Sequence, residues 1–414
     1  MPVILLLSAL TAWRLYVVGK FKAGIKWILL EIKPPLDVEK SPKLAESIFA
    51  GIHGTYLKTS PKKNFFKGEI PVWFSFEIVG TGGNIKFYVR CWEVMRNLIE
   101  AEIFGQYHDC EIKVVDDYMM DMPQFFDPKG EYGMFGAELI FNQPNVYPIK
   151  TYPYFEERTS KGFSKIIDPL SPLAETMSTL QPGEHIWLQF LVKPTGNDWV
   201  KESQAVINKL IGKEAVPVET KGEKVVSGIF KLTEGALREG LNLLEPEPLV
   251  PVKEEKKKEE FTLMRLTPGQ KIVLEMVENK ASKLGFKVGI RFIYLARNEI
   301  YNRSRISGVI GTFKQLYAND LNSFKPNPKT ATFSRGFLRY VFPGDRGFFA
   351  SAIEADRKEK IYRRYLLREI PKQVVILNTE ELATLWHIPG QEVKAPTLER
   401  VESKKGEPPA GLPR

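Results

Sequence analysis

The stretch that decides the fold is "IPVWFSFEIVGTGGNIKFYVRC", residues 70–91. Apolar and polar residues alternate well enough over 70–80 to predict a β-strand. The "TGGN" that follows at 81–84 contains two glycines, which accept the positive φ angles that a tight hairpin turn requires. Residues 85–91 then predict the returning strand, so a β-hairpin is expected here.

The elements around this hairpin predict a ferredoxin-like unit. "WILLEIKPP" (27–35) predicts a strand that the proline pair ends, and "SPKLAESIFAGIHG" (41–54) predicts a helix. After the hairpin, residues 93–107 predict an amphipathic helix and residues 110–118 another strand. Strand, helix, strand, strand, helix, strand is the order of a split βαβ unit. We therefore expect an α+β domain over 27–125.

A second pass of similar character follows, without close sequence similarity to the first. Strands are expected at 134–141, 148–155, 184–192 and 286–296, and helices at 168–180, 198–212, 267–285 and 304–317. Residues 213–260 contain "EPEPLVPVKEEKKKEE", which is charged, rich in proline and poor in residues to bury. The sequence thus predicts a second ferredoxin-like α+β domain over 126–375, interrupted by a charged linker.

The N-terminus favours a membrane-associated helix. "VILLLSALTAWRLYVV" (3–18) is shorter than the roughly 20 residues that a spanning helix needs, and no basic residue precedes it as in a signal peptide. A buried amphipathic helix is the alternative. We expect residues 1–26 to form a membrane anchor, with the following lysines keeping the body in the cytoplasm. The membrane-interface residues are then Trp13, Arg14, Tyr16, Lys20 and Lys22.

Basic residues gather in the C-terminal part, where residues 261–414 contain 27 Lys and Arg against 15 Asp and Glu. In "DRKEKIYRRYLLRE" (356–369), four basic residues recur at spacings of three and four and predict one cationic helix face for an anionic partner. They are Arg357, Lys360, Arg364 and Arg368. "FSRGFLRYVFPGDRGFF" (333–349) interleaves arginines with aromatics, as in surfaces that bind single-stranded nucleic acid. For the helix a solvated face is the favoured interpretation, and for the second stretch a buried aromatic seam with its arginines outside is favoured; contact with an anionic partner is the alternative in both.

Motifs of catalysis and metal binding are absent from the sequence. The four histidines form no pair at metal-ligand spacing with one another or with a cysteine, and neither a Walker-type phosphate loop nor a G-x-S-x-G elbow occurs. Asp116, Asp117 and Asp121 favour a solvated strand end over a cation site. Cys91 and Cys110 indicate buried thiols in a reducing compartment. The sequence predicts no enzyme, no cofactor and no metal.

Several runs together resemble a known family. They are "WILLEIKPP", "SPKLAESIFAGIHG", "PVWFSFEIVGTGGNIKFYVRC", "IEAEIFGQYHDCEIKVVDDY", "DPLSPLAETMSTLQPGEHIWLQFLV" and the closing "ILNTEELATLWHIPGQEVKAPTLERVESKKGEPPAGLP". These runs resemble the N-terminal, non-motor region of bacterial ATPases of the type IV secretion and conjugative-transfer kind. In that family a P-loop motor domain follows a tail of the "PPAGLP" type, and this sequence stops where the motor would start.

The resemblance implies a non-catalytic, membrane-anchored component of a type IV secretion or conjugation-like transfer system. It would lie at the bacterial inner membrane, with its body in the cytoplasm, and assemble with a P-loop ATPase supplied in trans. A homo-oligomer and DNA are further possible partners, and a nucleic-acid-binding protein using the basic C-terminal third is the alternative function. Residues 376–414 are expected to form a short helix, capped by Asn378 or Thr379, and an extended connector tail.

Overall fold

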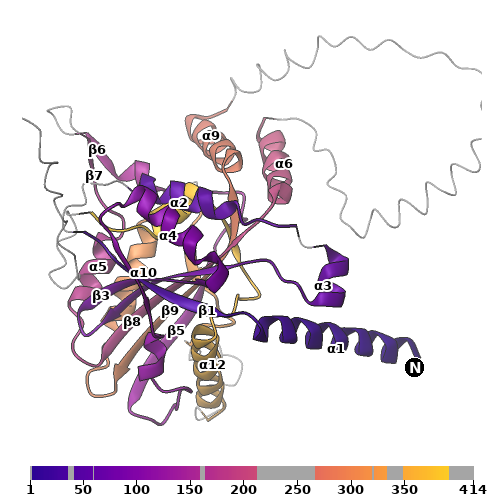
Figure 1. Ribbon diagram of the computed structural model, residues 1–414. Coiled ribbons are helices and arrows are strands. Elements are labelled where there is room, and N and C mark those ends of the chain that lie inside the picture. Colours follow the sequence, from indigo (N-terminus) through magenta and orange to yellow (C-terminus); the bar gives the residue numbers. More distant parts are fainter. Residues whose placement is uncertain are drawn as a thin grey trace, which may run out of the picture. The chain divides into compact units, whose positions relative to one another are not determined.

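The computed structural model gives the arrangement of most of the chain (Figure 1). It describes residues 2–35, 42–58, 60–158, 164–211, 266–318, 321–332 and 348–390. Among these, residues up to 197 and from 283 onward form one compact unit, and residues 198–282 form a second. The fold is α+β, built on an antiparallel sheet.

The first half of the sheet has the predicted ferredoxin-like topology. Its elements in chain order are β1 (Trp27–Lys33), α2 (Lys43–His53), α3 (Pro61–Lys67), β2 (Phe74–Thr81), β3 (Asn84–Trp92), α4 (Arg96–Gln106) and β4 (Glu111–Val115). The strands lie in the order β2-β3-β1-β4, and all neighbours are antiparallel. Gly82 and Gly83, with φ of +54° and +91°, make the hairpin turn as predicted.

The second half repeats this order. Its elements are β5 (Tyr132–Phe141), α5 (Ser171–Ser178), β8 (Glu184–Pro194), β9 (Gly285–Arg297), α10 (Ser304–Lys314) and β10 (Phe324–Pro326). The strands lie in the order β10-β5-β9-β8, which is the same arrangement of first, second, third and fourth strand. A short hairpin of β6 (Glu156–Arg158) and β7 (Ser164–Ile166) precedes α5.

The two halves share one nine-stranded sheet because β2 pairs with β8, from Phe74 opposite Val192 to Thr81 opposite His185. Each is the second strand of its unit, which would lie at an edge if the unit stood alone. Both strands are buried almost throughout, so each covers the hydrogen-bonding edge of the other. The ferredoxin-like units expected over 27–125 and 126–375 are thus halves of one body.

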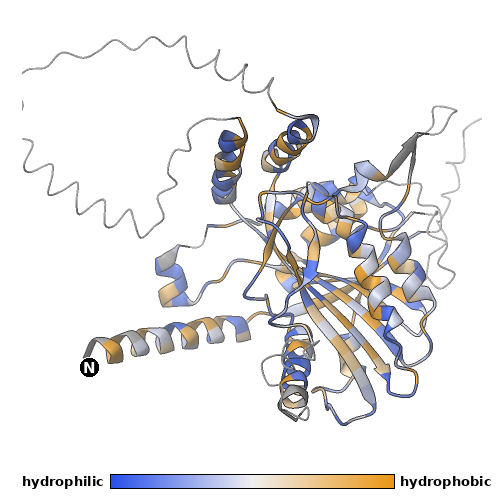
Figure 2. Ribbon diagram, turned by 180° about the vertical axis from the view of Figure 1, so that it is seen from behind, coloured by the Kyte–Doolittle hydropathy of each residue, from blue (hydrophilic) through white to orange (hydrophobic). Residues whose placement is uncertain are grey.

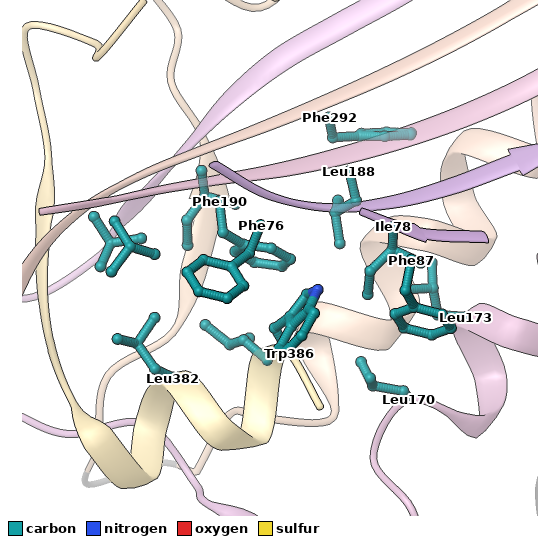
Figure 3. Packing of buried hydrophobic residues seen from close by; sticks show 14 of the residues in the cluster. Phe76, Ile78, Phe87, Leu170, Leu173, Leu188, Phe190, Phe292, Leu382 and Trp386 are labelled. Carbon is teal, nitrogen blue, oxygen red and sulfur yellow. The ribbon is translucent and has the colours of Figure 1, made fainter. Parts of the chain in front are cut away.

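The two faces of the sheet carry separate cores. Helices α2, α4, α5, α10 and α13 (Thr379–Leu385) bury the larger core on one face. Figure 3 shows part of it, in which Trp386 packs edge-on against Phe76 with 4.8 Å between ring centroids. The 3-10 turn η2 (Tyr118–Asp121) and helix α12 (Phe348–Leu366) cover the other face. Helix α12 follows β10, after the elements of both ferredoxin-like units are complete, so it is an addition to that order.

The insertion of the second half joins β8 to β9. It contains the 3-10 turn η4 (Asn197–Trp199), α6 (Val200–Leu210) and α9 (Pro268–Ser282), and α6 packs against α9 in the second compact unit. The charged stretch predicted at 213–260 lies outside the described residues.

The prediction of a strand at 148–155 requires correction. Residues 148–155, expected as a strand, form a loop and the 3-10 turn η3 (Tyr152–Phe155). The amides of Ile149 and Tyr152 donate to the Glu381 carboxylate and the Thr384 hydroxyl of α13, so they have no strand partner.

Residues 376–390 belong to the core, although they were expected to begin a connector. β11 (Val375–Asn378) pairs with β9 beyond the end of β5, and Leu382 and Trp386 are fully buried. The predicted helix is present as α13, and Asn378 and Glu381 form a reciprocal capping box. Residues 391–414, the predicted extended tail, lie outside the described part of the chain.

Candidate functional site

A row of polar side chains crosses the α12 face of the sheet. Glu138 on β5 lies opposite Arg291 on β9, Arg291 opposite Gln189 on β8, Gln189 opposite Glu77 on β2, and Glu77 opposite Tyr88 on β3. All five are buried. Buried charges are stable only when they are paired and hydrogen-bonded. The hydrogen-bond and ion-pair partners of these five side chains therefore show whether they stabilise the fold or are available to a ligand.

Arg368 pairs with the row from the segment that follows α12. Its Nε donates to Glu77 Oε1 (3.1 Å) and its Nη2 to Glu77 Oε2 (3.3 Å). Nη2 also donates to Asp117 Oδ1 (2.8 Å), while Nη1 donates to Asp117 Oδ2 and to the Leu366 carbonyl. All five N–H groups are thus used, and the side chain is 1% exposed. Arg368 has a φ of +49°, which only the surrounding contacts can hold in a residue other than glycine.

Arg291 fastens the same segment from the other side. Its Nη1 donates to Gln189 Oε1 (2.7 Å) and to the Arg364 carbonyl (2.9 Å). Its Nη2 donates to Glu138 Oε1 (3.2 Å) and to the Glu369 carbonyl (2.8 Å). The two guanidinium groups therefore bind the C-terminal end of α12 to four strands of the sheet. Arg368 uses all its donors in these contacts, whereas Arg291 uses its Nη1 and Nη2 groups and its buried Nε has no hydrogen-bond partner among the described residues.

The Arg368 charge shifts the acidity of its neighbours. Burial alone would raise the pKa of Glu77, but the charge and hydrogen bonds of Arg368 outweigh burial and hold this pKa below its ordinary value. The pKa of Asp117 is lowered in the same way. Burial and the Glu77 carboxylate raise the pKa of Tyr118 and Tyr365 well above 10, and the two hydroxyls lie 2.6 Å apart. The network is charged at neutral pH only at the carboxylates and guanidinium groups.

A cavity of about 340 Å³ opens on this face near the β2–β3 hairpin. Its walls come from β2, β3, β8 and the η2 turn and consist of Val79, Thr81, Asn84, Lys86, Tyr88, Tyr118, Asp121, Met122, His185 and Trp187. His185 Nδ1 lies 3.2 Å from Thr81 Oγ1, and burial lowers the pKa of His185 to about 4, so the ring is neutral near pH 7. The buried Trp187 indole nitrogen has no hydrogen-bond partner among the described residues. The pocket offers aromatic surface, neutral polar groups and the Asp121 carboxyl group, and Lys86 in its wall pairs with Glu31 (3.1 Å).

A different kind of site lies at the N-terminus. Helix α1 (Pro2–Ala23) is the one helix among the described residues that is long and apolar enough to cross a membrane, over Ile4–Ala23. Its large apolar side chains are exposed, among them Ile4, Leu5, Leu6, Leu10 and Leu15. Figure 2 shows the hydrophobic colour along this helix. Exposed apolar surface of this extent marks an interaction site for a membrane or another protein.

The predicted membrane-interface residues lie on this helix. Trp13, Arg14 and Tyr16 are exposed at its middle, and Lys20 and Lys22 are exposed in its last turns. Phe21 packs against Trp92 at the C-terminal end of β3 (6.2 Å between centroids), where Trp27 also contacts Trp92. An aromatic cluster therefore joins the C-terminal end of α1 to the body.

The four basic residues predicted on one helix face have separate surroundings. Arg368 lies beyond the end of α12 and is buried, because the helix stops at Leu366. Arg364 lies 3.5 Å from the buried Glu138, Arg357 donates to the Ala331 carbonyl (3.1 Å), and Lys360 pairs with Asp356 on the surface. The prediction that these four residues form one continuous cationic helix face is therefore wrong, because Arg368 is buried beyond the end of the helix. Binding of an anionic partner by Arg357 and Lys360 stays a prediction, and residues 333–347 of the aromatic–arginine stretch lie outside the described ranges.

Within the described ranges, no group of three or more His, Cys, Asp or Glu residues can hold a metal ion. Cys91 and Cys110 are buried and form no disulfide bond among the described residues, and burial raises the pKa of Cys91 to about 12. His387 Nε2 lies 3.0 Å from Asp168 Oδ1, and its Nδ1 lies 2.7 Å from the Ala383 carbonyl, which holds the end of α13 in the core.

The residues of the charge row escaped the sequence prediction. Glu77, Glu138, Gln189 and Arg291 are charged or amide residues in the middle of largely apolar strands, as in "FSFEIVG" and "GIRFIYLA". That pattern was the available signal, since a strand buried on both faces accepts a charge only beside a partner.

Comparison with models of protein families gives a match over most of the chain. A family model described as a domain of unknown function (DUF8128) matches residues 20–400. Among proteins of curated function, none matches the chain. The match begins within the last turn of α1 and covers both halves of the sheet and the insertion. The chain therefore belongs to the DUF8128 family.

Proposed function

We propose that this chain is a membrane-attached assembly protein, whose α+β body serves as a docking unit on the cytoplasmic side. One observation carries the attachment: α1 exposes Ile4, Leu5, Leu6, Leu10 and Leu15, and among its described apolar side chains Val17 alone is buried. A helix that exposes apolar side chains around its circumference is unfavourable in water at the surface of a monomer, and it requires a membrane or a protein partner to cover them. Lys20, Lys22 and Lys26 follow the apolar segment, and such lysines favour the cytoplasmic side.

The proposed partner is a separately encoded P-loop ATPase of a macromolecule-transfer system. The support for this partner is the resemblance of the sequence runs to the non-motor region of transfer ATPases. A doubled ferredoxin-like body is compatible with such a role, but fold alone does not determine function. In this proposal the chain holds the ATPase at the membrane: α1 contacts the bilayer, and the α+β body binds the ATPase.

Copurification tests the two parts separately. If a P-loop ATPase is encoded beside its gene, the full chain expressed with that ATPase is expected in the membrane fraction and is expected to retain the ATPase after detergent extraction. The variant Leu5→Glu/Leu6→Glu is expected to leave the membrane fraction and still retain the ATPase. Recovery of the full chain without the ATPase contradicts the assembly role, and a full chain found only in the soluble fraction contradicts the attachment.

The alternative function, direct nucleic-acid binding, has weaker support. Arg364 and Arg368 are engaged by carboxylates of the body, which leaves Arg357 and Lys360 of the four predicted residues for an anionic partner. Nucleic-acid affinity that falls steeply with salt and weakens in Arg357→Gln/Lys360→Gln favours this alternative.

A further inference from the structure

Helix α3 lies against the middle of α1, at a distance from its C-terminal end. Trp13 Nε1 donates to the Phe65 carbonyl of α3 (3.2 Å). Gly68, which ends α3, approaches the α1 backbone so closely that an added Cβ would lie 2.3 Å from the Val17 carbonyl oxygen. Gly68 also has a φ of +67°, which favours glycine. The contact between the helices therefore runs from Trp13 to Val17.

The composition of α3 is that of a segment at a lipid headgroup layer. Phe65 and Phe66 pack edge to face, and Phe66 is 67% exposed. Lys62 and Lys67 are exposed and form no ion pair with the residues that the structure describes, while Lys63 lies 3.8 Å from Glu69. Aromatic rings and lysines are the residues that prefer the boundary between hydrocarbon and water.

The contact between α1 and α3 limits how deeply α1 can enter a bilayer. If the segment Ile4–Ala23 were centred in a bilayer, Trp13 and Arg14 would lie at the midplane, and the α1–α3 contact would bring the lysines of α3 into the hydrocarbon. Charged side chains at that depth are strongly disfavoured. If Trp13 lies at the headgroup boundary, residues 4–12 extend about 13 Å into the hydrocarbon, close to half of its roughly 30 Å thickness.

We infer that α1 meets the bilayer surface between Trp13 and Val17, and that α3 lies in the headgroup layer of an anionic membrane as a second point of contact. This inference rests on the membrane attachment proposed above. Residues 4–12 enter the lipid. Arg14 and Tyr16 lie at its surface, and Lys20 and Lys22 lie on the water side. The phosphate groups of acidic phospholipids are the ligands of the α3 lysines.

Fluorescent labels on single introduced cysteines measure the depth directly. The native Cys91 and Cys110 are buried, and the unmodified chain controls for their labelling. The full chain is bound to vesicles of phosphatidylcholine with phosphatidylglycerol, and an environment-sensitive dye is placed in turn at Leu6→Cys, Phe66→Cys and Lys22→Cys. Quenchers in the acyl chains, at the headgroups and in the water report the depth of each dye.

We expect the dye at position 6 to respond to the acyl-chain quencher, at 66 to the headgroup quencher, and at 22 to the aqueous quencher. A dye at 66 as accessible to water as that at 22, with position 6 in the acyl chains, overturns the inference and leaves membrane attachment intact. A dye at position 6 that remains in water contradicts the attachment itself.

A charge-neutralising variant tests the lipid chemistry. Lys62→Gln/Lys67→Gln is expected to lower the affinity for phosphatidylglycerol-containing vesicles by roughly thirty-fold and to leave binding to pure phosphatidylcholine unchanged. The control Lys129→Gln/Lys329→Gln removes two exposed lysines elsewhere and is expected to bind as the unmodified chain does. Equal affinity of both variants for the acidic vesicles refutes the role of α3.

Discussion

Replacement of Arg368 by methionine tests whether the buried charge row holds α12 to the sheet. The substitution keeps a long apolar side chain and removes all five donated hydrogen bonds, of which four go to Glu77 and Asp117. Removal of one partner from a buried ion pair typically costs about 3–5 kcal/mol, because the remaining charge has no counter-ion. Glu77 keeps donors from Ser75, Tyr118 and Gln189, so we expect a loss near 3 kcal/mol.

The pH dependence of this loss separates it from a packing defect. Arg368 holds the pKa of Glu77 below its ordinary value of 4.5, so the stabilisation is present above pH 4.5 and is lost as the pH falls through the folded-state pKa. In Arg368→Met the pKa of Glu77 rises. The difference in unfolding free energy between the two proteins is therefore largest near pH 7 and narrows on acidification.

Urea denaturation of the full chain in detergent, followed by tryptophan fluorescence and circular dichroism at several pH values, measures this difference. Trp187 stacks on Tyr365 (5.4 Å between centroids) and reports on the α12 region. Lys360→Met is the matched control, since Lys360 is 64% exposed in a surface ion pair, and should cost less than about 1 kcal/mol. A loss in Arg368→Met below 1 kcal/mol, or one that does not change between pH 7 and pH 4, refutes the reasoning.

Three further substitutions test the fold at other points. Burial lowers the pKa of His185 from 6.5 to about 4, so the unfolding free energy that depends on this neutral ring is fully present above pH 6.5 and falls by up to about 3 kcal/mol towards pH 4. His185→Gln should flatten this part of the curve of unfolding free energy against pH. An unchanged slope refutes the role of His185. Gly289→Ala places a Cβ 2.2 Å from Pro371 Cδ, so we expect the unfolding free energy in urea titration to fall by about 1–3 kcal/mol. An unchanged unfolding free energy would show that the segment after α12 moves freely. Asn378→Ala removes the α13 capping box and should cost about 0.5–2 kcal/mol with increased hydrogen exchange in α13, whereas unchanged exchange contradicts the role of the cap.

The topology of each half of the sheet could be predicted because its signals are local. The hairpin at 70–91 and the helices on either side of it are determined by residues near in sequence. The pairing of β2 with β8 joins residues more than a hundred positions apart, and no local pattern specifies it. The end of the chain misled the prediction for the same reason. Residues 376–414 were expected as a short helix and a connector, whereas Glu381 and Thr384 of that helix accept hydrogen bonds from the backbone of a distant loop.

The charged residues show a similar limit. Spacing alone placed Arg368 on the cationic helix face, but the chain leaves the helix before this residue and turns through a positive φ toward Glu77. Helical periodicity cannot show where a helix ends when no glycine or proline marks its last turn. The helix at the N-terminus could be recognised from its apolar composition with aromatic and basic neighbours, while the place of its exposed residues at a membrane interface stays a prediction.

Vesicle flotation of the full chain tests the central claim, that α1 attaches this body to a membrane. The unmodified chain is expected to rise through a density gradient with vesicles containing phosphatidylglycerol. Leu5→Glu/Leu6→Glu should remain at the bottom with an unchanged circular dichroism spectrum of the body, because the two exposed leucines provide apolar contact with lipid. If the unmodified chain stays at the bottom, or if both proteins float equally, α1 is not the membrane attachment.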